Sequence, residues 1–250
     1  MAIRLASIAS KIVSFNQFGF IKERCIQDCL VTAFECVNFL KKSSRGGNIA
    51  IKLDVRKAFD TMDWGSICKV LHMFGFDNTF ISWVMSILSS APISILINGS
   101  PKGCFTCSRG VRQGDPLSAI IFSIAEDYLS RLVYIMAGNR KMKAINTGRG
   151  IHAPTHLLYA DDIILFTTGD KRNIKNIKRE LLHYTSISGQ EISWDKSFVY
   201  FGKNLTVSRK NDIVQELVIH KGFLPFKYLG VPLFWGRPKA CYFSKIISSI

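Results

Sequence analysis

Long apolar runs are missing from this chain of 250 residues. A transmembrane helix needs about 18 or more consecutive apolar residues, and no such stretch occurs. Residues 1–4, Met-Ala-Ile-Arg, lead into a mixed, helix-like segment instead of the clean apolar region of a secretory signal. Internal repeats and low-complexity segments are also absent. We therefore expect an intracellular protein, nuclear or cytoplasmic, with no membrane partner.

Acidic residues are scarce. The chain has 18 Asp and Glu against 33 Lys and Arg, a formal net charge of +15. Such an excess favours a polyanionic partner, although a merely basic globular protein would have the same composition. The basic residues are spread along the chain instead of collected on one amphipathic stretch, which disfavours an anionic membrane. A hydrophobic fraction of 48% is enough for a core and argues against a disordered tail.

The cysteines do not form a recognisable framework. There are seven, an odd number, scattered through the chain, which indicates free thiols in a reducing compartment. Cys104, Cys107, His152 and His156 imitate a zinc pattern. However, 44 residues separate the two pairs, against roughly 12–15 in a zinc finger. The cysteines also lie in a hairpin-like stretch and His156 opens an apolar strand, so we do not expect zinc here.

Apolar periodicity predicts the main elements. Helical spacing occurs over 26–42, 64–75, 79–90, about 116–136 and 171–187. Asp115 and Pro116 stand in the favoured N-cap and first positions of the fourth of these helices. Residues 49–55 alternate instead, which predicts a strand with one core face and Asp54 on its more polar face.

Turn signals predict several hairpins. Asn98-Gly99 lies between apolar runs, a strong hairpin signal. A strand pair is also expected around Asp161 and Asp162, two short strands with a turn over 189–202, and a last hairpin over 223–236. Helices interleaved with antiparallel hairpins predict an α+β fold instead of a doubly wound parallel sheet.

Two adjacent acids interrupt the apolar run "LLYADDIILF", 157–166. A buried carboxylate costs several kcal/mol unless it is paired or holds a metal. Asp161, Asp162 and Asp54 side by side would repel one another, and a divalent cation such as Mg²⁺ removes that repulsion. Two ions about 3.5–4 Å apart serve in-line displacement at phosphorus, so phosphoryl transfer on nucleic acid is indicated. The alternative is that Asp161 caps a turn and Asp54 is solvated.

Six blocks in one order extend this pattern. "YADD" at 159–162, "KLDVRKAFD" at 52–60 and "RGVRQGDPLS" at 109–118 resemble the reverse transcriptase family, most closely the polymerases of plant LINE-type (non-LTR) retrotransposons. The likeness continues in "NQFGFIKERCIQD" at 16–28, "SGQEISWDKS" at 188–197 and "FKYLGVPL" at 226–233. It covers nearly the whole chain.

The resemblance assigns roles to particular residues. Asp54 matches the acid of the family's motif A, and Asp161 and Asp162 match motif C, which implies that these three carboxylates hold two Mg²⁺ ions, with Mn²⁺ as a substitute. Asp162 would assist the other two. Phe59 matches the steric gate that rejects a 2′-OH and so favours dNTPs over rNTPs; the alternative for a Phe is plain core packing.

Other matched residues would contact the substrate. Gln113 and Gly114 match motif B, beside a helix N-terminus where N–H groups favour phosphate. Arg112 either pairs with a phosphate or faces water. Lys196 matches the motif D lysine, a candidate acid for the leaving pyrophosphate. Arg24 matches a basic residue of the fingers that contacts triphosphate or template, and 227–233 resembles the primer grip.

The chain departs from the family pattern in several places. The family has more finger sequence before "NQFGF" and a thumb after the primer grip; Glu23 stands where Gly is usual and Ala119 where Pro is usual. We expect partial fingers at 1–48, a palm with motifs A to D at 49–222, and the primer-grip hairpin with the start of the thumb at 223–250. A longer parent protein would supply the missing fingers, thumb and endonuclease regions.

The resemblance implies an RNA-directed DNA polymerase that extends a DNA primer on an RNA template with dNTPs, acting in the nucleus. One alternative is a catalytically inactive remnant that binds nucleic acid and extends nothing. Another is an RNA-directed RNA polymerase, which Phe59 and the Tyr159-Ala160 pair before the acids disfavour. Binding without turnover would indicate the remnant, and use of dNTPs over rNTPs the DNA polymerase.

Overall fold

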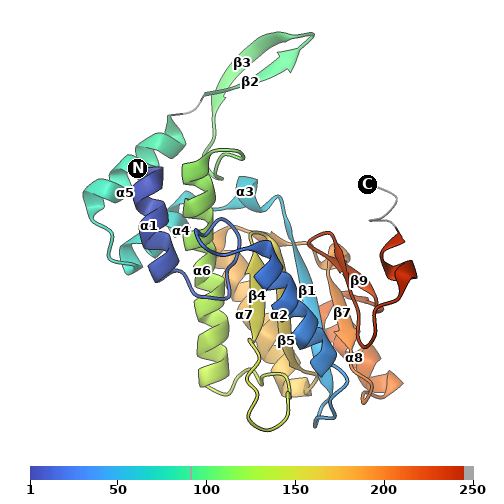
Figure 1. Cartoon of the computed structure of the whole chain (residues 1–250). Helices are drawn as coiled ribbons and strands as arrows, with labels where there is room; N and C mark the ends of the chain where they lie inside the picture. The colour runs from blue at the N-terminus through green and yellow to red at the C-terminus, as the bar shows by residue number, and fades with distance from the viewer. Residues whose placement is uncertain (91, 245–250) are drawn as a thin grey trace.

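A computed structural model describes residues 1–90 and 92–244. A central antiparallel sheet runs through its middle, in the order β4-β5-β1-β7-β8, and only the β7–β8 pair is parallel. Figure 1 shows helices on both sides of this sheet. Its strands are β1 (Asn48–Arg56), β4 (His156–Tyr159), β5 (Asp162–Thr168), β7 (Phe198–Phe201) and β8 (His220–Lys221); β6 (Glu191–Ile192) pairs with the end of β1.

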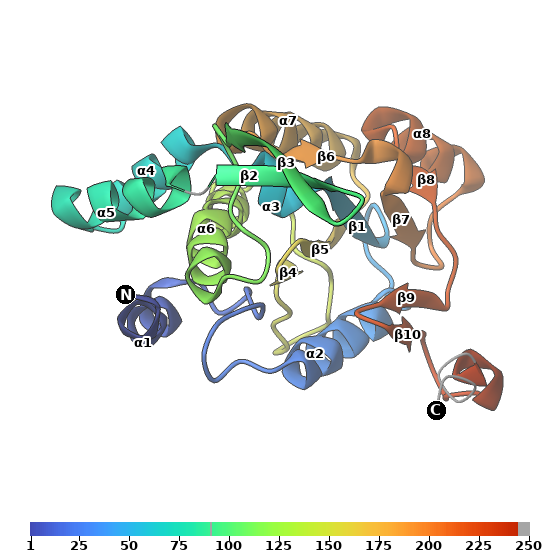
Figure 2. The same ribbon diagram turned by 90° about the horizontal axis from the view of Figure 1, so that it is seen from above.

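The helices lie on both sides of the sheet and in a further group beside it. They are α1 (Ala2–Ile12), α2 (Ile26–Phe39), α3 (Ala58–Thr61), α4 (Trp64–Met73), α5 (Asn78–Ser89), α6 (Pro116–Gly138), α7 (Lys171–Ser188) and α8 (Val207–Leu217), with 3₁₀ turns η1 (Trp194–Lys196) and η2 (Ala240–Tyr242). Seen from above, α7 and α8 lie on one side of the sheet and α2 lies on the other (Figure 2). The α+β prediction is confirmed.

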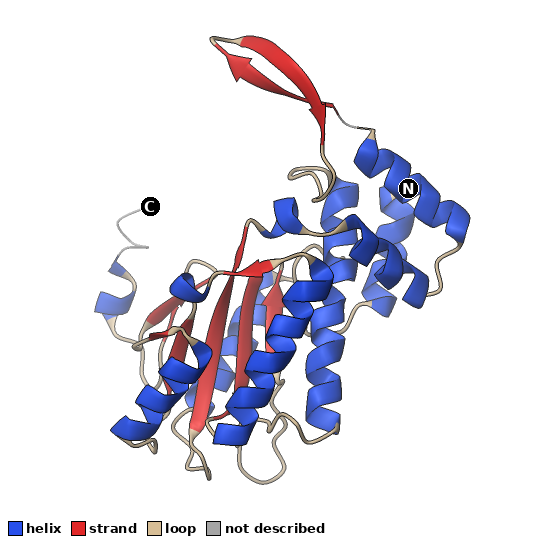
Figure 3. Cartoon of the chain, turned by 180° about the vertical axis from the view of Figure 1, so that it is seen from behind, coloured by secondary structure: helices blue, strands red, loops and turns tan. Residues whose placement is uncertain are grey.

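Two hairpins stand apart from the central sheet. β2 (Pro92–Ile97) and β3 (Ser100–Thr106) form an exposed arm that projects from the molecule (Figure 3). Its turn, Asn98-Gly99, has positive φ at both residues, as a type I′ turn requires. β9 (Phe226–Tyr228) and β10 (Val231–Leu233) form the second hairpin, near α2. Both hairpins were predicted from the sequence.

One prediction about β1 was wrong. Alternation predicted one core face, but Ile49, Ile51 and Leu53 pack into one core while Ala50, on the opposite face, is equally buried in a second core. The second core exists because α2 and the β9–β10 hairpin cover that face. Only its far end, at Lys52 and Asp54, is left half-buried. α8 was also not predicted, because its sequence is dominated by polar residues.

Candidate active site

Asp54 and Asp162 face each other at one end of the sheet. β1 and β5 pair antiparallel with Asp54 directly opposite Asp162. Opposite residues on neighbouring strands point to the same face of the sheet, with Cβ atoms about 4.5–5.5 Å apart. Asp161 is exposed and is the second residue of the two-residue turn between β4 and β5, immediately before Asp162. The structure therefore brings the three predicted acids to one end of the sheet.

The turn that carries Asp161 is held from behind by the "NQFGF" segment. Ala160 adopts a left-handed conformation with φ of 54°. The side-chain oxygen of Gln17 accepts hydrogen bonds from the N–H groups of Ala160 (3.2 Å) and Gly19 (2.9 Å). A Cβ on Gly19 would lie 2.3 Å from the Ala160 nitrogen, so only glycine fits against the turn. The sequence block was recognised, but this supporting role was not predicted.

The backbone of Asp54 is fixed by the loop that carries Lys196. The Ser193 N–H donates to the Asp54 carbonyl at 2.8 Å, and the Asp54 N–H donates to the Ser197 hydroxyl at 3.1 Å. Ser197 is fully buried and its hydroxyl donates in turn to the Ser193 carbonyl. Lys196 itself is exposed, and its positive charge opposes the rise in the pKa of Asp54. This loop therefore places a cation beside the candidate motif A acid.

Two of the acids at this end of the sheet, Asp54 and Asp162, have raised pKa values. Burial raises the pKa of Asp54, while Lys196 and Lys52 lower it and Asp161 raises it. Burial likewise raises the pKa of Asp162, and the negative charges of Asp161 and Asp54 add to that rise. Carboxylates that destabilise one another in this way are typical of functional sites, because folding alone gains nothing from them.

Lys52 is a site residue that the sequence reasoning missed. Its ammonium nitrogen lies 3.6 Å from a carboxylate oxygen of Asp162 and donates to the Lys227 carbonyl of the β9–β10 hairpin at 3.4 Å. Because Lys52 and Asp54 are two residues apart on one strand, alternation already placed them on the same face. Lys52 thus partly neutralises the acids and connects them to the candidate primer grip.

A cavity of about 460 Å³ opens beside Asp161. Among the residues that line it are Phe59, Gln113, Gly114 and Asp161, which belong to three separate sequence blocks, together with Phe20, Asp115, Pro116 and Ala119. Phe59 lies parallel to Phe122, with ring centroids 4.3 Å apart, and Phe20 meets it edge-on at 5.8 Å. The Phe59 ring is therefore packed on one side and still borders open space.

The helix beside this cavity begins as predicted. The Asp115 carboxylate accepts hydrogen bonds from the N–H groups of Leu117 (3.2 Å) and Ser118 (3.1 Å), and Pro116 is the first residue of α6. Burial would raise the pKa of Asp115, but the bonds from Ser118 and Leu117 outweigh it and hold that pKa below its usual value. Since Asp115 occupies these N–H groups, a phosphate here would meet the loop at Gly114, where φ is 87° and no atom lies within 4 Å of the position that a Cβ would take.

Two predicted arginines are engaged elsewhere. Arg24 donates to the carbonyls of Ser14 and Gln17, both at 2.6 Å, and to those of Val13 and Ser10 at the end of α1. The Arg112 guanidinium donates to the Ile87 carbonyl in the last turn of α5. Contact of either residue with phosphate stays a prediction, because both guanidinium groups are used here to hold main chain.

The three carboxylates at the end of the sheet suit Mg²⁺, which prefers carboxylate oxygens as ligands. Asp54, Asp161 and Asp162 supply those oxygens, and Lys52 already provides one positive charge beside Asp162. Across residues 1–90 and 92–244, however, no three His, Cys, Asp or Glu side chains stand close enough to form a metal site as placed. Metal ligation by the three acids therefore stays a prediction.

The residues that imitate a zinc pattern lie in different surroundings. His156 is fully buried between the hydroxyls of Thr155 and Ser130, while Cys104 and Cys107 are exposed on and just after the β2–β3 arm.

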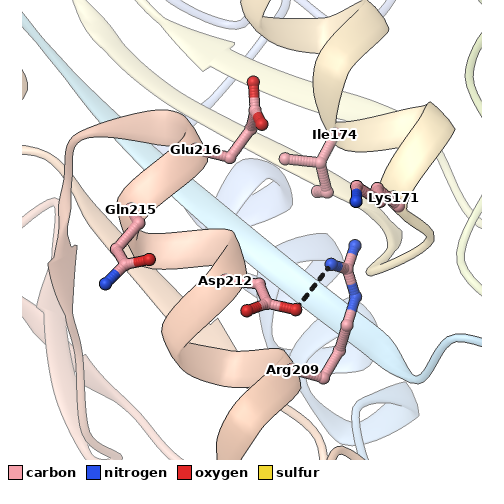
Figure 4. Close-up of a pocket in the computed structure, with 6 residues that line it drawn as sticks. All are labelled: Lys171, Ile174, Arg209, Asp212, Gln215 and Glu216. Atoms are coloured by element: carbon pink, nitrogen blue, oxygen red, sulfur yellow. Dashed lines mark hydrogen bonds and ion pairs between the residues drawn. The ribbon is translucent and has the colours of Figure 1, made fainter.

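Another cavity, of about 330 Å³, lies between α7 and α8 (Figure 4). Lys171, Arg209, Asp212 and Glu216 are among its lining residues, and Arg209 pairs with Asp212 at 3.5 Å. Its charges are balanced and it contains no predicted site residue.

In the part of the chain that the structure describes, no helix has the length and apolar character needed to cross a bilayer.

The α+β fold is that of a polymerase palm. The family model described as reverse transcriptase (RNA-dependent DNA polymerase) matches residues 1–233, and the chain belongs to this family. It is 31% identical over 146 residues to the Pol polyprotein of the R2DM retrotransposable element of Drosophila melanogaster, covering 58% of this chain and 13% of that one. It is 26% identical over 239 residues to a 149 kDa protein of the Xenopus laevis transposon TX1, covering 93% and 17%.

Solved structures agree on the fold. Apo telomerase from Candida tropicalis superimposes with a TM-score of 0.57 at 14% identity, over 82% of this chain and 41% of that chain. An uncharacterised mitochondrial protein of Arabidopsis thaliana is 40% identical over 67 residues, 27% of this chain and 55% of its own. The chain spans between 11% and 30% of the length of the R2 and TX1 relatives.

Proposed function

We propose that this chain is the polymerase domain of a reverse transcriptase from a plant LINE-type retrotransposon. It would copy an RNA template by adding dNTPs to the 3′-OH of a DNA primer. Family membership and the retrotransposon relatives support the activity. The ordered sequence blocks and the Arabidopsis relative support the plant origin.

One observation carries this proposal. The cavity beside Asp161 is lined by residues from motifs A, B and C, namely Phe59, Gly114 and Asp161. It lies at the end of the sheet where Asp54 faces Asp162. A nucleotide seated there would meet an aromatic ring, an open glycine loop and a carboxylate at once. An ordinary structural cavity has no reason to combine these three.

The residues would divide the reaction among them. Asp54, Asp161 and Asp162 would hold two Mg²⁺ ions, which when bound stabilise the attacking and leaving oxygens of phosphoryl transfer. Phe59 would sit under the sugar and exclude a 2′-OH. Gln113 and Gly114 would orient the nucleotide, and Lys196 would give a proton to the leaving pyrophosphate.

The rest of the chain would serve template and primer. We assign partial fingers to 1–48, the palm to 49–222, and the primer grip with the start of the thumb to 223–250, of which 245–250 lie outside the described residues. The β9–β10 hairpin, bonded to Lys52 through the Lys227 carbonyl, would hold the primer end near the acids. Fingers, thumb and endonuclease regions of a longer parent would complete the grip, acting in the nucleus.

An inactive nucleic-acid-binding remnant is the second candidate. It is favoured by the Lys52–Asp162 pair and by the use of Arg24 to hold main chain. Incorporation assays on an RNA template separate the two. The polymerase incorporates dNTPs and not rNTPs when Mg²⁺ is present. Duplex binding with no incorporation in either Mg²⁺ or Mn²⁺ would instead establish the remnant, and rNTP incorporation would contradict both.

A further inference from the structure

A dense basic surface covers one flank of the palm. Five basic side chains lie within the first nine residues of α7: Lys171, Arg172, Lys175, Lys178 and Arg179. The segment after α6 adds Arg140, Lys141 and Lys143. Asn176 donates to the Lys141 carbonyl at 2.8 Å, and the Lys143 N–H donates to Asn173 at 3.2 Å, so this segment lies against α7. We call these eight side chains the α7 basic surface.

This surface lies on the other side of the sheet from the candidate active site. α7 buries Ile174, Ile177 and Leu181 in the core that contains Leu53. Asp54 follows Leu53 on β1 and so points to the opposite face, which α2 covers. Figure 2 shows α7 and α2 on opposite sides of the sheet. A chain bound at the α7 basic surface would therefore not occupy the cavity beside Asp161.

Most of the α7 basic surface has no acidic partner. Lys143 pairs with Asp170 at 3.0 Å, and Arg179 pairs with Glu180 at 2.8 Å. Within residues 1–90 and 92–244, the other six side chains have no acid at ion-pairing distance. All eight are exposed except Lys178, which is half-buried. The surface therefore presents a concentrated positive charge to solvent.

The arrangement is unfavourable for α7 itself. Lys171 and Lys175, and Lys175 and Arg179, are like charges four residues apart, which destabilises a helix. Lys171 and Arg172 also lie at the positive end of the helix dipole, where the first turn has no acid and the N-cap residue Asp170 pairs with Lys143. Because these like charges lower the stability of the helix, an anionic partner is the simplest reason for them.

We propose that the α7 basic surface binds the phosphate backbone of RNA outside the catalytic cleft. Its Lys and Arg side chains offer no aromatic ring for base stacking, so binding would be independent of sequence and strongly dependent on salt. A membrane fits less well, since the apolar face of α7 is already buried in the core and has nothing left to insert. The inference shares with the proposed function only the premise of a nucleic-acid partner.

Salt-dependent binding of single-stranded oligouridylate tests this surface. We compare the native chain with a Lys171→Gln, Arg172→Gln, Lys175→Gln, Arg179→Gln variant. The matched control neutralises four basic side chains that are exposed outside the assigned fingers and primer grip: Lys69→Gln, Lys102→Gln, Arg149→Gln and Lys203→Gln. Each phosphate contact contributes about 0.7 to the slope of log K against log salt for single strands. We expect the slope to fall by about 2 to 3 in the first variant and by less than about 1 in the control.

Equal loss in both variants, or loss in neither, would overturn the proposal. Amine acylation of the native chain gives a second readout that needs no variant: RNA should protect Lys171 and Lys175, and unchanged labelling would count against it. Vesicles rich in phosphatidylserine should not bind through this surface; binding lost in the first variant, with RNA binding intact, would make the surface a membrane site instead. None of these outcomes depends on primer extension, so they are separable from failure of the proposed function.

Discussion

Asp54 lies directly opposite Asp162 on neighbouring antiparallel strands, and Lys52, two residues before Asp54, pairs with Asp162. Burial raises the pKa of both acids. A carboxyl whose folded pKa is raised destabilises the fold once it is ionised, so this pair costs stability at neutral pH. A bound cation would remove that cost.

The first prediction follows from this pair. Asp54→Asn should raise the free energy of unfolding at pH 7 by about 0.5–1 kcal/mol, as functional residues often do when replaced. Mg²⁺ at about 100 times its Kd should stabilise the native chain by about 2.7 kcal/mol and the variant by far less. Thermal unfolding with and without Mg²⁺ measures both effects. Equal stabilisation of the two chains would remove Asp54 from the metal site.

Replacing Phe59 should relax sugar selection. Phe59→Val keeps an apolar side chain but removes the ring, so the preference for dNTP over rNTP should fall about 10- to 100-fold, within the range that a pocket contact provides. Loss of the stack on Phe122 should also cost about 1–2 kcal/mol. Competing incorporation and chemical unfolding are the measurements. If stability falls but discrimination is unchanged, Phe59 is a packing residue only.

Gly19→Ala should disturb the turn that carries Asp161. The new Cβ would lie 2.3 Å from the Ala160 nitrogen, a main-chain atom that cannot step aside freely. We expect a loss of about 1–3 kcal/mol, the usual cost of overpacking. Gly138→Ala is the control, because nothing lies within 4 Å of that Cβ at the end of α6, and it should be neutral or slightly stabilising. Similar unfolding midpoints for the two variants would refute the supporting role of Gly19.

Glu126 should make stability depend on pH. Burial raises the pKa of this α6 carboxyl to about 7, although Tyr184 donates to it at 2.8 Å. Because the folded pKa is raised, the folded chain holds a proton that the unfolded chain releases, and stability falls as pH rises from about 4.5 to 7, by roughly 3 kcal/mol. In Glu126→Gln this part of the pH dependence should vanish. Denaturant unfolding across that range measures it, and a parallel profile for both chains would contradict the assignment.

Sequence alone predicted the elements whose signals are local. Asp115-Pro116 specified the start of α6, and Asn98-Gly99 specified the β2–β3 turn. The three acids were found because carboxylates are rare in apolar strands. Lys52 and Gly19 were missed because their roles depend on partners far away in the chain: Lys227 for Lys52, and Ala160 for Gly19. The second core beneath β1 was missed for the same reason.

Arg24 shows a different limit of prediction from sequence. A matching motif predicts which residue type is present, but four main-chain carbonyls decide where its donors point. Burial lowers the pKa of Arg24, against the opposing charge of Asp127. Asp127 and three of the four carbonyls, those of Ser10, Val13 and Ser14, lie outside the block at 16–28 that identified Arg24, so its prediction as a substrate contact was made without them.

Primer extension on an RNA template, with Mg²⁺ and dNTPs, tests the central claim most directly. The native chain is compared with an Asp161→Asn, Asp162→Asn double variant whose fold is checked by circular dichroism. We predict extension by the native chain and a loss of at least about 1,000-fold in the variant, since the metal-bound acids carry the transition-state charge. Equal extension by both chains, or none by a native chain that still binds the template–primer duplex, would contradict a working two-metal site at Asp54, Asp161 and Asp162.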